Sequence, residues 1–230
     1  MQTPVPFRTC IVVACLAVSL LVNLALAVFY GHLRADQRVA ALASLGGREH
    51  RSGPTIILGD SVVADLVSPD GRLVNLAVPG ATVDWIASQQ VAIVDNLRPK
   101  RIFLAVGIND LRNGTSPEQT VDSLLGLATK LESTSRNTKV ILLAILPPSR
   151  TSILAGRATP SNVARANRLL IEGATQRGIA AIDYSTLFSK NDGLDDRLTY
   201  DGLHLNVSGM AILQDMFFHG LAPKAPGKTE

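Results

Sequence analysis

Short apolar runs alternate with longer amphipathic segments between residues 54 and 220, and this alternation leaves few folds open to the chain. Each run is rich in Val, Ile and Leu and is bounded by turn residues, as is typical of a strand buried on both faces. The runs lie at residues 55–58, 73–77, 101–106, 139–145 and 179–183. Strands that alternate with helices form a parallel sheet covered by helices. The sequence therefore predicts an α/β three-layer sandwich around a central parallel sheet of about five strands.

Two of the amphipathic segments have clear helix boundaries. Ser116 precedes Pro117, and Gln119 follows at the spacing of a capping box, so a helix is predicted to begin there. A second helix is predicted to begin at Pro160 and to end before Gly178. Each has an apolar stripe that we expect to face the core, formed by Val121, Leu124, Leu125, Ala128 and Leu131 in the first helix and by Val163, Ala166, Leu170 and Ala174 in the second.

Four short motifs follow one another along the chain. Gly-Asp-Ser at 59–61 follows the first run, Gly80 follows the second, Gly-Ile-Asn-Asp at 107–110 follows the third, and Asp-Gly-Leu-His at 201–204 lies near the C-terminus. In open α/β sheets the carboxyl ends of the strands gather the chemistry. A serine at the end of a buried strand, together with a distant histidine that has its own aspartate, is the set of groups that a serine hydrolase uses.

In these four motifs the chain resembles the SGNH hydrolases, also called GDSL esterases or lipases, over residues 54–220. The resemblance implies a flavodoxin-like fold and a serine esterase that needs no cofactor. It implies that Ser61 is the nucleophile, that His204 is the general base and that Asp201 orients His204. It also implies an oxyanion hole formed by Ser61, Gly80 and Asn109.

The residues themselves are suited to these roles, although each also has a structural explanation. A histidine can accept a proton and later return it, because imidazole titrates near neutral pH. Ser61 is expected to begin a short helix, so that its backbone N–H points toward a developing oxyanion. Alternatively, Gly-Asp-Ser is only a turn, Gly80 is a turn glycine, and Asn109 is a helix cap. The presence of all the motifs together favours the functional interpretation.

Asp60 and Asp110 are the carboxylates nearest to these groups, and we expect both to make structural hydrogen bonds. A glycosidase with two catalytic carboxylates is the rival interpretation. It would leave Ser61, Asn109 and His204 unexplained. We also expect Asn206 to cap the last helix and so to fix the loop that carries His204.

Several other classes of protein are disfavoured by the sequence. It contains no Gly-x-Ser-x-Gly, no His-Glu-x-x-His and no Cys-x-x-Cys, and no Gly-x-Gly-x-x-Gly follows a strand run. A dedicated metal site or a dinucleotide cofactor is therefore unsupported. The net charge of +3 is mild and no basic run is interleaved with aromatic residues, so nucleic acid is a poor candidate partner.

The N-terminal part of the chain predicts a membrane segment. Residues 1–8 form a short head, and residues 9–30 form a 22-residue apolar run that is long enough to cross a bilayer. The run is either a transmembrane anchor or a signal peptide cleaved after Ala27. A stalk and linker at 31–53, an esterase domain at 54–222 and a disordered tail at 223–230 follow. We expect the domain to lie on the periplasmic or extracellular side of the membrane, or to be secreted if the segment is cleaved.

The sequence leaves the reaction partner open. Small-molecule, lipid and carbohydrate esters all fit the predicted chemistry, and the acyl length is not determined. The same groups would also serve an acyltransferase that passes the acyl group to a sugar or another alcohol, because the difference lies in water exclusion and acceptor binding. A third hypothesis is a catalytically inactive binding module held at the membrane. The oligomeric state also remains open.

Overall fold

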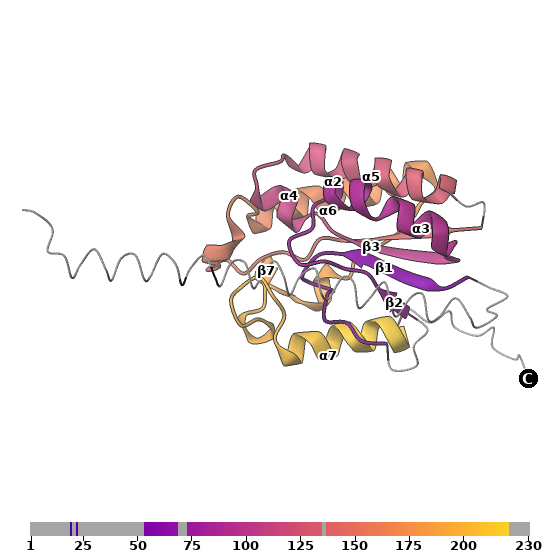
Figure 1. Ribbon diagram of the computed structural model, residues 1–230. Coiled ribbons are helices and arrows are strands. Elements are labelled where there is room, and N and C mark those ends of the chain that lie inside the picture. Colours follow the sequence, from indigo (N-terminus) through magenta and orange to yellow (C-terminus); the bar gives the residue numbers. More distant parts are fainter. Residues whose placement is uncertain (1–18, 20–21, 23–52, 69–72, 135–136, 221–230) are drawn as a thin grey trace, which may run out of the picture. The chain divides into compact units, whose positions relative to one another are not determined.

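The computed structural model describes residues 53–68, 73–134 and 137–220, together with Ser19 and Val22. Its centre is a five-stranded parallel sheet with the strand order β2-β1-β3-β4-β5 (Figure 1). The strands are β1 (Thr55–Gly59), β2 (Leu73–Asn75), β3 (Arg101–Ala105), β4 (Lys139–Leu143) and β5 (Ala180–Ile182). All five match the predicted runs to within two residues at every boundary, so the α/β sheet is confirmed.

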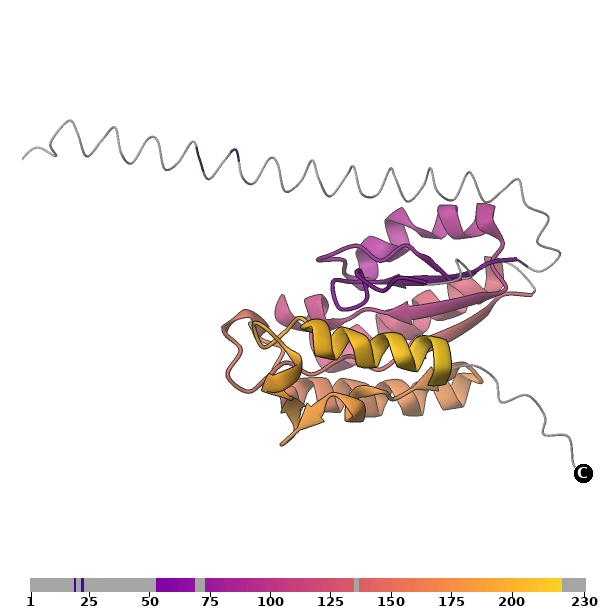
Figure 2. The same cartoon turned by 90° about the horizontal axis from the view of Figure 1, so that it is seen from below.

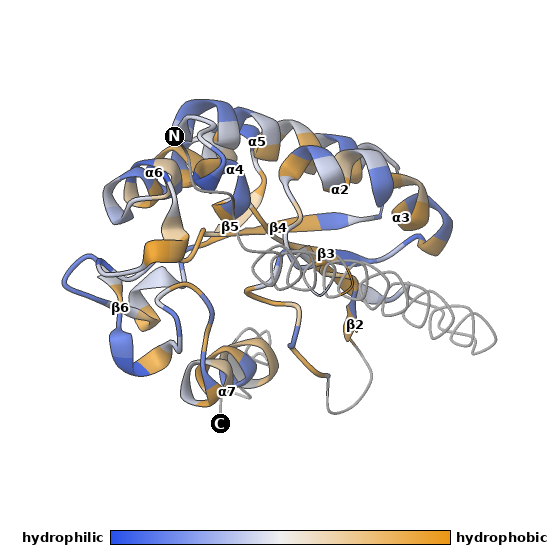
Figure 3. Cartoon of the chain, turned by 60° about the vertical axis from the view of Figure 1, so that its left-hand side comes forward, coloured by the Kyte–Doolittle hydropathy of each residue, from blue (hydrophilic) through white to orange (hydrophobic). Residues whose placement is uncertain are grey.

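Helices cover both faces of this sheet, which gives three layers. One face carries α2 (Val83–Gln89), α3 (Val91–Leu97), α4 (Ile108–Arg112), α5 (Pro117–Thr134) and α6 (Pro160–Arg177) (Figures 1 and 3). The other face carries α7 (Val207–Asp215) and the π-helical turn η4 (Met216–Gly220). Phe217 of η4 packs edge-on against Phe103 of β3, with ring centroids 5.2 Å apart. The apolar strands therefore lie between two helical layers.

Both long helices begin where the sequence predicts, and α6 also ends there. At the start of α5 the Ser116 hydroxyl accepts a hydrogen bond from the Gln119 N–H, and the Gln119 side chain accepts one from the Ser116 N–H. At the start of α6 the Thr159 side chain accepts from Asn162 N–H, and Gly178 ends the helix with a φ of 67°. The predicted apolar stripes of both helices are buried. These local signals hold because capping and amphipathicity depend on near neighbours.

The segment after β1 differs from the prediction. Residues 61–65 form a series of turns and not the short helix that we expected to begin at Ser61. The reason is the Asn75 side chain, whose amide donates hydrogen bonds to the carbonyl groups of Val63, Ala64 and Leu66. Helix carbonyl groups point along the axis toward N–H groups four residues ahead, so three of them cannot converge on one side chain.

Smaller elements connect the layers. They are η1 (Ile153–Ala155), η2 (Ser185–Leu187), the two-residue strands β6 (Ser189–Lys190) and β7 (Gly193–Leu194), and η3 (Asp196–Leu198). Strands β6 and β7 pair in antiparallel fashion apart from the main sheet. Near them α7 runs along the sheet face, as the view from below shows (Figure 2).

Within the described part of the chain, no helix is both long enough and apolar enough to span a bilayer. Apart from Ser19 and Val22, the predicted hydrophobic helix at 9–30 lies outside the described residues. The head at 1–8, almost all of the stalk and linker, and the tail at 223–230 also lie outside them. The predicted domain boundaries therefore stay predictions.

The strand order determines where a ligand can bind. After β1 the chain adds β2 on one side, and it then returns to add β3 on the other side of β1. Such a reversal opens a crevice between the carboxyl ends of the two strands, where ligands of open α/β sheets bind. Here that crevice lies beyond Gly59 and Ala105, which are paired across β1 and β3.

Candidate active site

The residues beyond the ends of β1, β2 and β3 lie next to one another. The Val78 N–H donates to the Gly59 carbonyl at 2.9 Å, and the Asp60 N–H donates to the Ala105 carbonyl at 3.1 Å. The loop that carries Gly80 is thereby joined to the segment that carries Ser61. Three of the four predicted motifs thus meet at one edge of the sheet.

The fourth motif brings a histidine to the same place. His204 Nε2 lies 3.0 Å from the Ser61 hydroxyl oxygen, and His204 Nδ1 lies 2.6 Å from Asp201 Oδ2. The side chains of His204 and Asp201 are 28% and 20% exposed, so the chain of hydrogen bonds is shielded but can be reached from solvent. A serine hydrogen-bonded to a histidine, which is in turn hydrogen-bonded to a carboxylate, is the arrangement that activates a serine nucleophile.

Local hydrogen bonds fix the loop that carries His204. Asp201 Oδ1 accepts from the N–H groups of Leu203 and His204 at 2.9 and 2.7 Å, and the Thr199 hydroxyl donates to the His204 carbonyl at 2.6 Å. As predicted, Asn206 caps α7 by accepting from the Gly209 N–H. Partial burial pushes the pKa of Asp201 upward, but the hydrogen bonds from His204 and Leu203 together bring it below its usual value. This carboxylate is therefore ionised at neutral pH.

The predicted oxyanion donors are the Asn109 side chain and the backbone N–H groups of Gly80 and Ser61. Asn109 is 4% exposed, and its side-chain N–H donates to the Ala81 carbonyl at 3.0 Å, which holds Asn109 next to Gly80. Gly80 has a φ of 81°, a left-handed conformation that favours glycine. Among the described residues, the backbone N–H groups of Gly80 and Ser61 have no hydrogen-bond acceptor. The site thus contains an amide side chain and two backbone N–H groups, one of them that of the serine itself, for which the described residues supply no acceptor.

The two neighbouring carboxylates bond to the loop backbone, in agreement with their predicted structural roles. Asp60 Oδ1 accepts from the Val62 N–H at 3.0 Å, and burial raises the pKa of Asp60 to about 7. Both oxygens of Asp110 lie 3.2 Å from the Val83 N–H at the start of α2, and burial raises the pKa of Asp110 to about 6.

Two residues at the site were missed by the sequence analysis. The Tyr200 ring stacks on the His204 ring with centroids 5.8 Å apart and an interplanar angle of 12°, and Tyr200 is 71% exposed. Arg112 donates to Asn109 Oδ1 at 2.9 Å. Each had a positional signal in the sequence, because Tyr200 directly precedes the Asp-Gly-Leu-His motif and Arg112 follows Asn109 by one helical turn.

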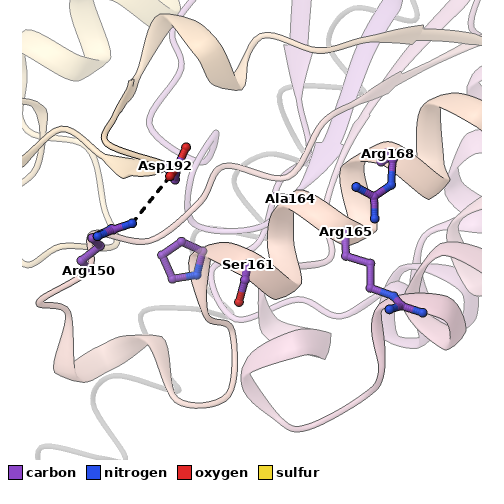
Figure 4. Close-up of a pocket in the computed structure, with 7 residues that line it drawn as sticks. Arg150, Ser161, Ala164, Arg165, Arg168 and Asp192 are labelled. Carbon is purple, nitrogen blue, oxygen red and sulfur yellow. Dashed lines mark ion pairs between the residues drawn. The ribbon is translucent and has the colours of Figure 1, made fainter.

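A separate pocket of about 460 Å³ contains none of the five predicted site residues. It is lined by Arg150, Pro160, Ser161, Ala164, Arg165, Arg168 and Asp192 (Figure 4). Arg150 is paired with Asp192, and Arg165 with Glu118, so two of its three positive charges are offset. Within the described residues, no three His, Cys, Asp or Glu side chains are grouped closely enough to hold a metal ion.

Three solved structures with the same fold each have a sequence identity below 25% with this chain. A GDSL-like lipase from Bacteroides thetaiotaomicron is 18% identical with a TM-score of 0.68, over 81% of this chain and 96% of that one. A lipase/acylhydrolase from Enterococcus faecalis is 19% identical with a TM-score of 0.60, over 77% and 100%. An acetylxylan esterase from Geobacillus stearothermophilus is 15% identical with a TM-score of 0.57, over 74% and 95%.

Comparison with curated protein sequences gave no significant match. The sequence model of the GDSL-like lipase/acylhydrolase family, in contrast, matches residues 53–212, which is most of the chain and includes all four motifs. The match also agrees with the fold that these similar structures share. The chain therefore belongs to the GDSL-like lipase/acylhydrolase family and is an esterase or acylhydrolase of that family.

Proposed function

We propose that the protein hydrolyses carboxylic esters through an acyl-enzyme intermediate on Ser61. The observation that carries this proposal is the continuous chain of hydrogen bonds from the Ser61 hydroxyl through His204 to Asp201. His204 Nε2 takes the hydroxyl proton while Ser61 Oγ bonds to the ester carbonyl carbon. The bond from that carbon to the alcohol oxygen then breaks, and the alcohol leaves with the proton from His204.

Water completes the cycle in the same way. His204 takes a proton from a water molecule, whose oxygen bonds to the acyl carbon, and the bond to Ser61 Oγ breaks as the serine regains a proton. In both halves the carbonyl oxygen becomes an oxyanion. In our proposal the side-chain amide of Asn109 and the backbone N–H groups of Gly80 and Ser61 stabilise this oxyanion, as preorganised donors do in a shielded site.

Acetylated carbohydrates are the substrates that we propose to test first. One of the structures with the same fold is an acetylxylan esterase. In this chain Trp85, on the helix after the Gly80 loop, is 37% exposed, and Tyr200, which stacks on His204, is 71% exposed. An exposed aromatic face beside the proposed base suits the apolar face of a sugar ring.

The test of this function is turnover of p-nitrophenyl esters of increasing acyl length, and of an acetylated xylo-oligosaccharide, by the full chain in mild detergent. We expect p-nitrophenolate from the acetyl ester and acetate from the oligosaccharide. Rates that rise with acyl length would instead indicate a lipid ester. Transfer of the acyl group to an added alcohol, with little free acid, would indicate an acyltransferase. A folded protein without turnover of any ester would indicate the inactive binding module.

We further propose that residues 9–30 hold the protein in the membrane with the esterase domain on the exported side. The support is the length of the apolar run and the position of the basic residue Arg8 before it. The measurement is fractionation of expressing cells, followed by protease treatment of intact cells or spheroplasts. We expect the intact chain in the membrane fraction and digestion of the domain from outside. A mature N-terminus at Val28 would indicate a cleaved signal, and a protected domain would contradict export.

A further inference from the structure

Two partners hold the side chain of Asn109 from opposite ends. Its Nδ2 donates to the Ala81 carbonyl at 3.0 Å, and its Oδ1 accepts from Arg112 Nη1 at 2.9 Å. Arg112 lies at the end of α4, three residues after Asn109, where helix geometry places two side chains on one face. The same guanidinium group donates from Nε to the Leu154 carbonyl of η1 at 2.8 Å.

These contacts fix which way the amide of Asn109 faces. An asparagine side chain carries one oxygen and one NH₂ group of almost the same shape, and only its hydrogen-bond partners distinguish the two orientations. If the Asn109 amide turned over, its oxygen would face the Ala81 carbonyl and its NH₂ group would face a guanidinium cation. Both contacts would be repulsive. In the observed orientation one N–H binds Ala81, and the second has no acceptor among the described residues.

We propose that Arg112 is a positioning residue for the oxyanion hole: it holds the Asn109 amide so that the second N–H is directed at the oxyanion. The proposal rests on the proposed function of Asn109. Ala81 alone does not suffice, because it holds only the nitrogen end of the amide and leaves the oxygen end without a hydrogen-bond donor. Arg112 supplies the second contact, and its bond to Leu154 holds the guanidinium group in turn.

The contact with Leu154 joins the oxyanion donor to the segment that borders the site. The Arg157 N–H also donates to the Arg112 carbonyl, and the Ser152 hydroxyl donates to the Asp201 carbonyl beside His204. The segment from Ser152 to Arg157 therefore contacts both α4, which carries Asn109, and the loop that carries His204. Arg112 is the side chain that connects this segment with an amide of the predicted oxyanion hole.

The test is a double-mutant cycle on p-nitrophenyl acetate with the wild type, Arg112→Met, Asn109→Ala and the double variant. Methionine keeps most of the unbranched apolar stem of arginine and removes every donor. We expect Asn109→Ala to lower kcat about 100-fold or more, as the loss of one oxyanion donor does. We expect Arg112→Met to lower kcat about 10-fold or more with KM changed less than about twofold, because an amide held at one end only loses part of that stabilisation.

The decisive comparison is the effect of Arg112→Met when Asn109 is already alanine. If Arg112 acts through Asn109, the second substitution lowers kcat less than about twofold further, because coupled residues are not additive. An equal loss in both backgrounds would show an independent structural effect and would overturn the proposal. Wild-type kcat in Arg112→Met would also overturn it.

Further variants test whether the loss of kcat has another cause, such as a loss of stability. Arg112→Lys keeps a cationic hydrogen-bond donor on an unbranched stem, so we expect partial rescue of kcat relative to Arg112→Met, even if both lose stability. Arg168→Met, on the exposed face of α6, is the matched control and should keep wild-type kinetics. If Asn109→Ala keeps full kcat while Ser61→Ala is inactive, the role of Asn109 and of Arg112 fails, whereas the nucleophile proposal stands.

Discussion

Replacing Ser61 with alanine is expected to lower kcat for ester hydrolysis by about 10⁴-fold to 10⁶-fold, with little change in KM. The substitution removes the oxygen that bonds to the acyl carbon, whereas the other site residues stay in place. The residual rate would come from binding and from oxyanion stabilisation of direct attack by water. The measurement is the steady-state rate on p-nitrophenyl acetate beside the uncatalysed rate.

The matched control is Ser123→Ala on the exposed face of α5, which should keep wild-type kcat. Thermal unfolding of both variants should stay close to that of the wild type, because each loses one hydroxyl group that is not fully buried. If Ser61→Ala kept more than about a hundredth of the wild-type kcat, a covalent intermediate on this serine would be excluded, because loss of a nucleophile costs far more.

Replacing Asp201 with asparagine is expected to lower kcat by about 10³-fold to 10⁴-fold. The asparagine oxygen can still accept from the N–H groups of Leu203 and His204, so the loop keeps its shape. Its NH₂ group then faces His204 Nδ1, and that nitrogen must become an acceptor. The ring proton moves to Nε2, which can no longer take the proton of Ser61.

Nitrogen-15 NMR of labelled histidine measures this change directly, because it reports which ring nitrogen carries the proton. In the wild type we expect the proton of neutral His204 on Nδ1, and in Asp201→Asn on Nε2. Asp122→Asn, on the exposed face of α5, is the control and should change neither the spectrum of His204 nor kcat. An active Asp201→Asn variant with an unchanged tautomer would show that another group orients His204.

The sheet and the long helices could be predicted because their signals are local. The central strands are buried on both faces, so Ile56, Ile57 and Leu58 form an uninterrupted apolar run. The caps of α5 and α6 depend on residues within one helical turn. Because the strands of a parallel sheet all end at the same edge, the predicted sheet also places the serine, glycine and asparagine motifs at that edge.

The remaining features depend on contacts between distant parts of the chain. The turns after Ser61 are set by Asn75, and the orientation of Asn109 is set by Arg112, whose other partner lies 42 residues away at Leu154. The stacking of Tyr200 on His204 depends on the turn at Gly202 between them. No periodic pattern records such contacts, because they exist only when the fold brings the partners together.

The hydrogen bond between Ser61 and His204 joins residues 143 positions apart, and the histidine comes just before α7, the last α-helix of the described chain. A ribosome releases the serine long before it releases the histidine, and domains generally fold as units once they have emerged. A growing or truncated chain that ends before His204 therefore carries the proposed nucleophile without its proposed base. In the proposed mechanism, ester hydrolysis can therefore begin only after the segment that carries His204 has been made and has folded.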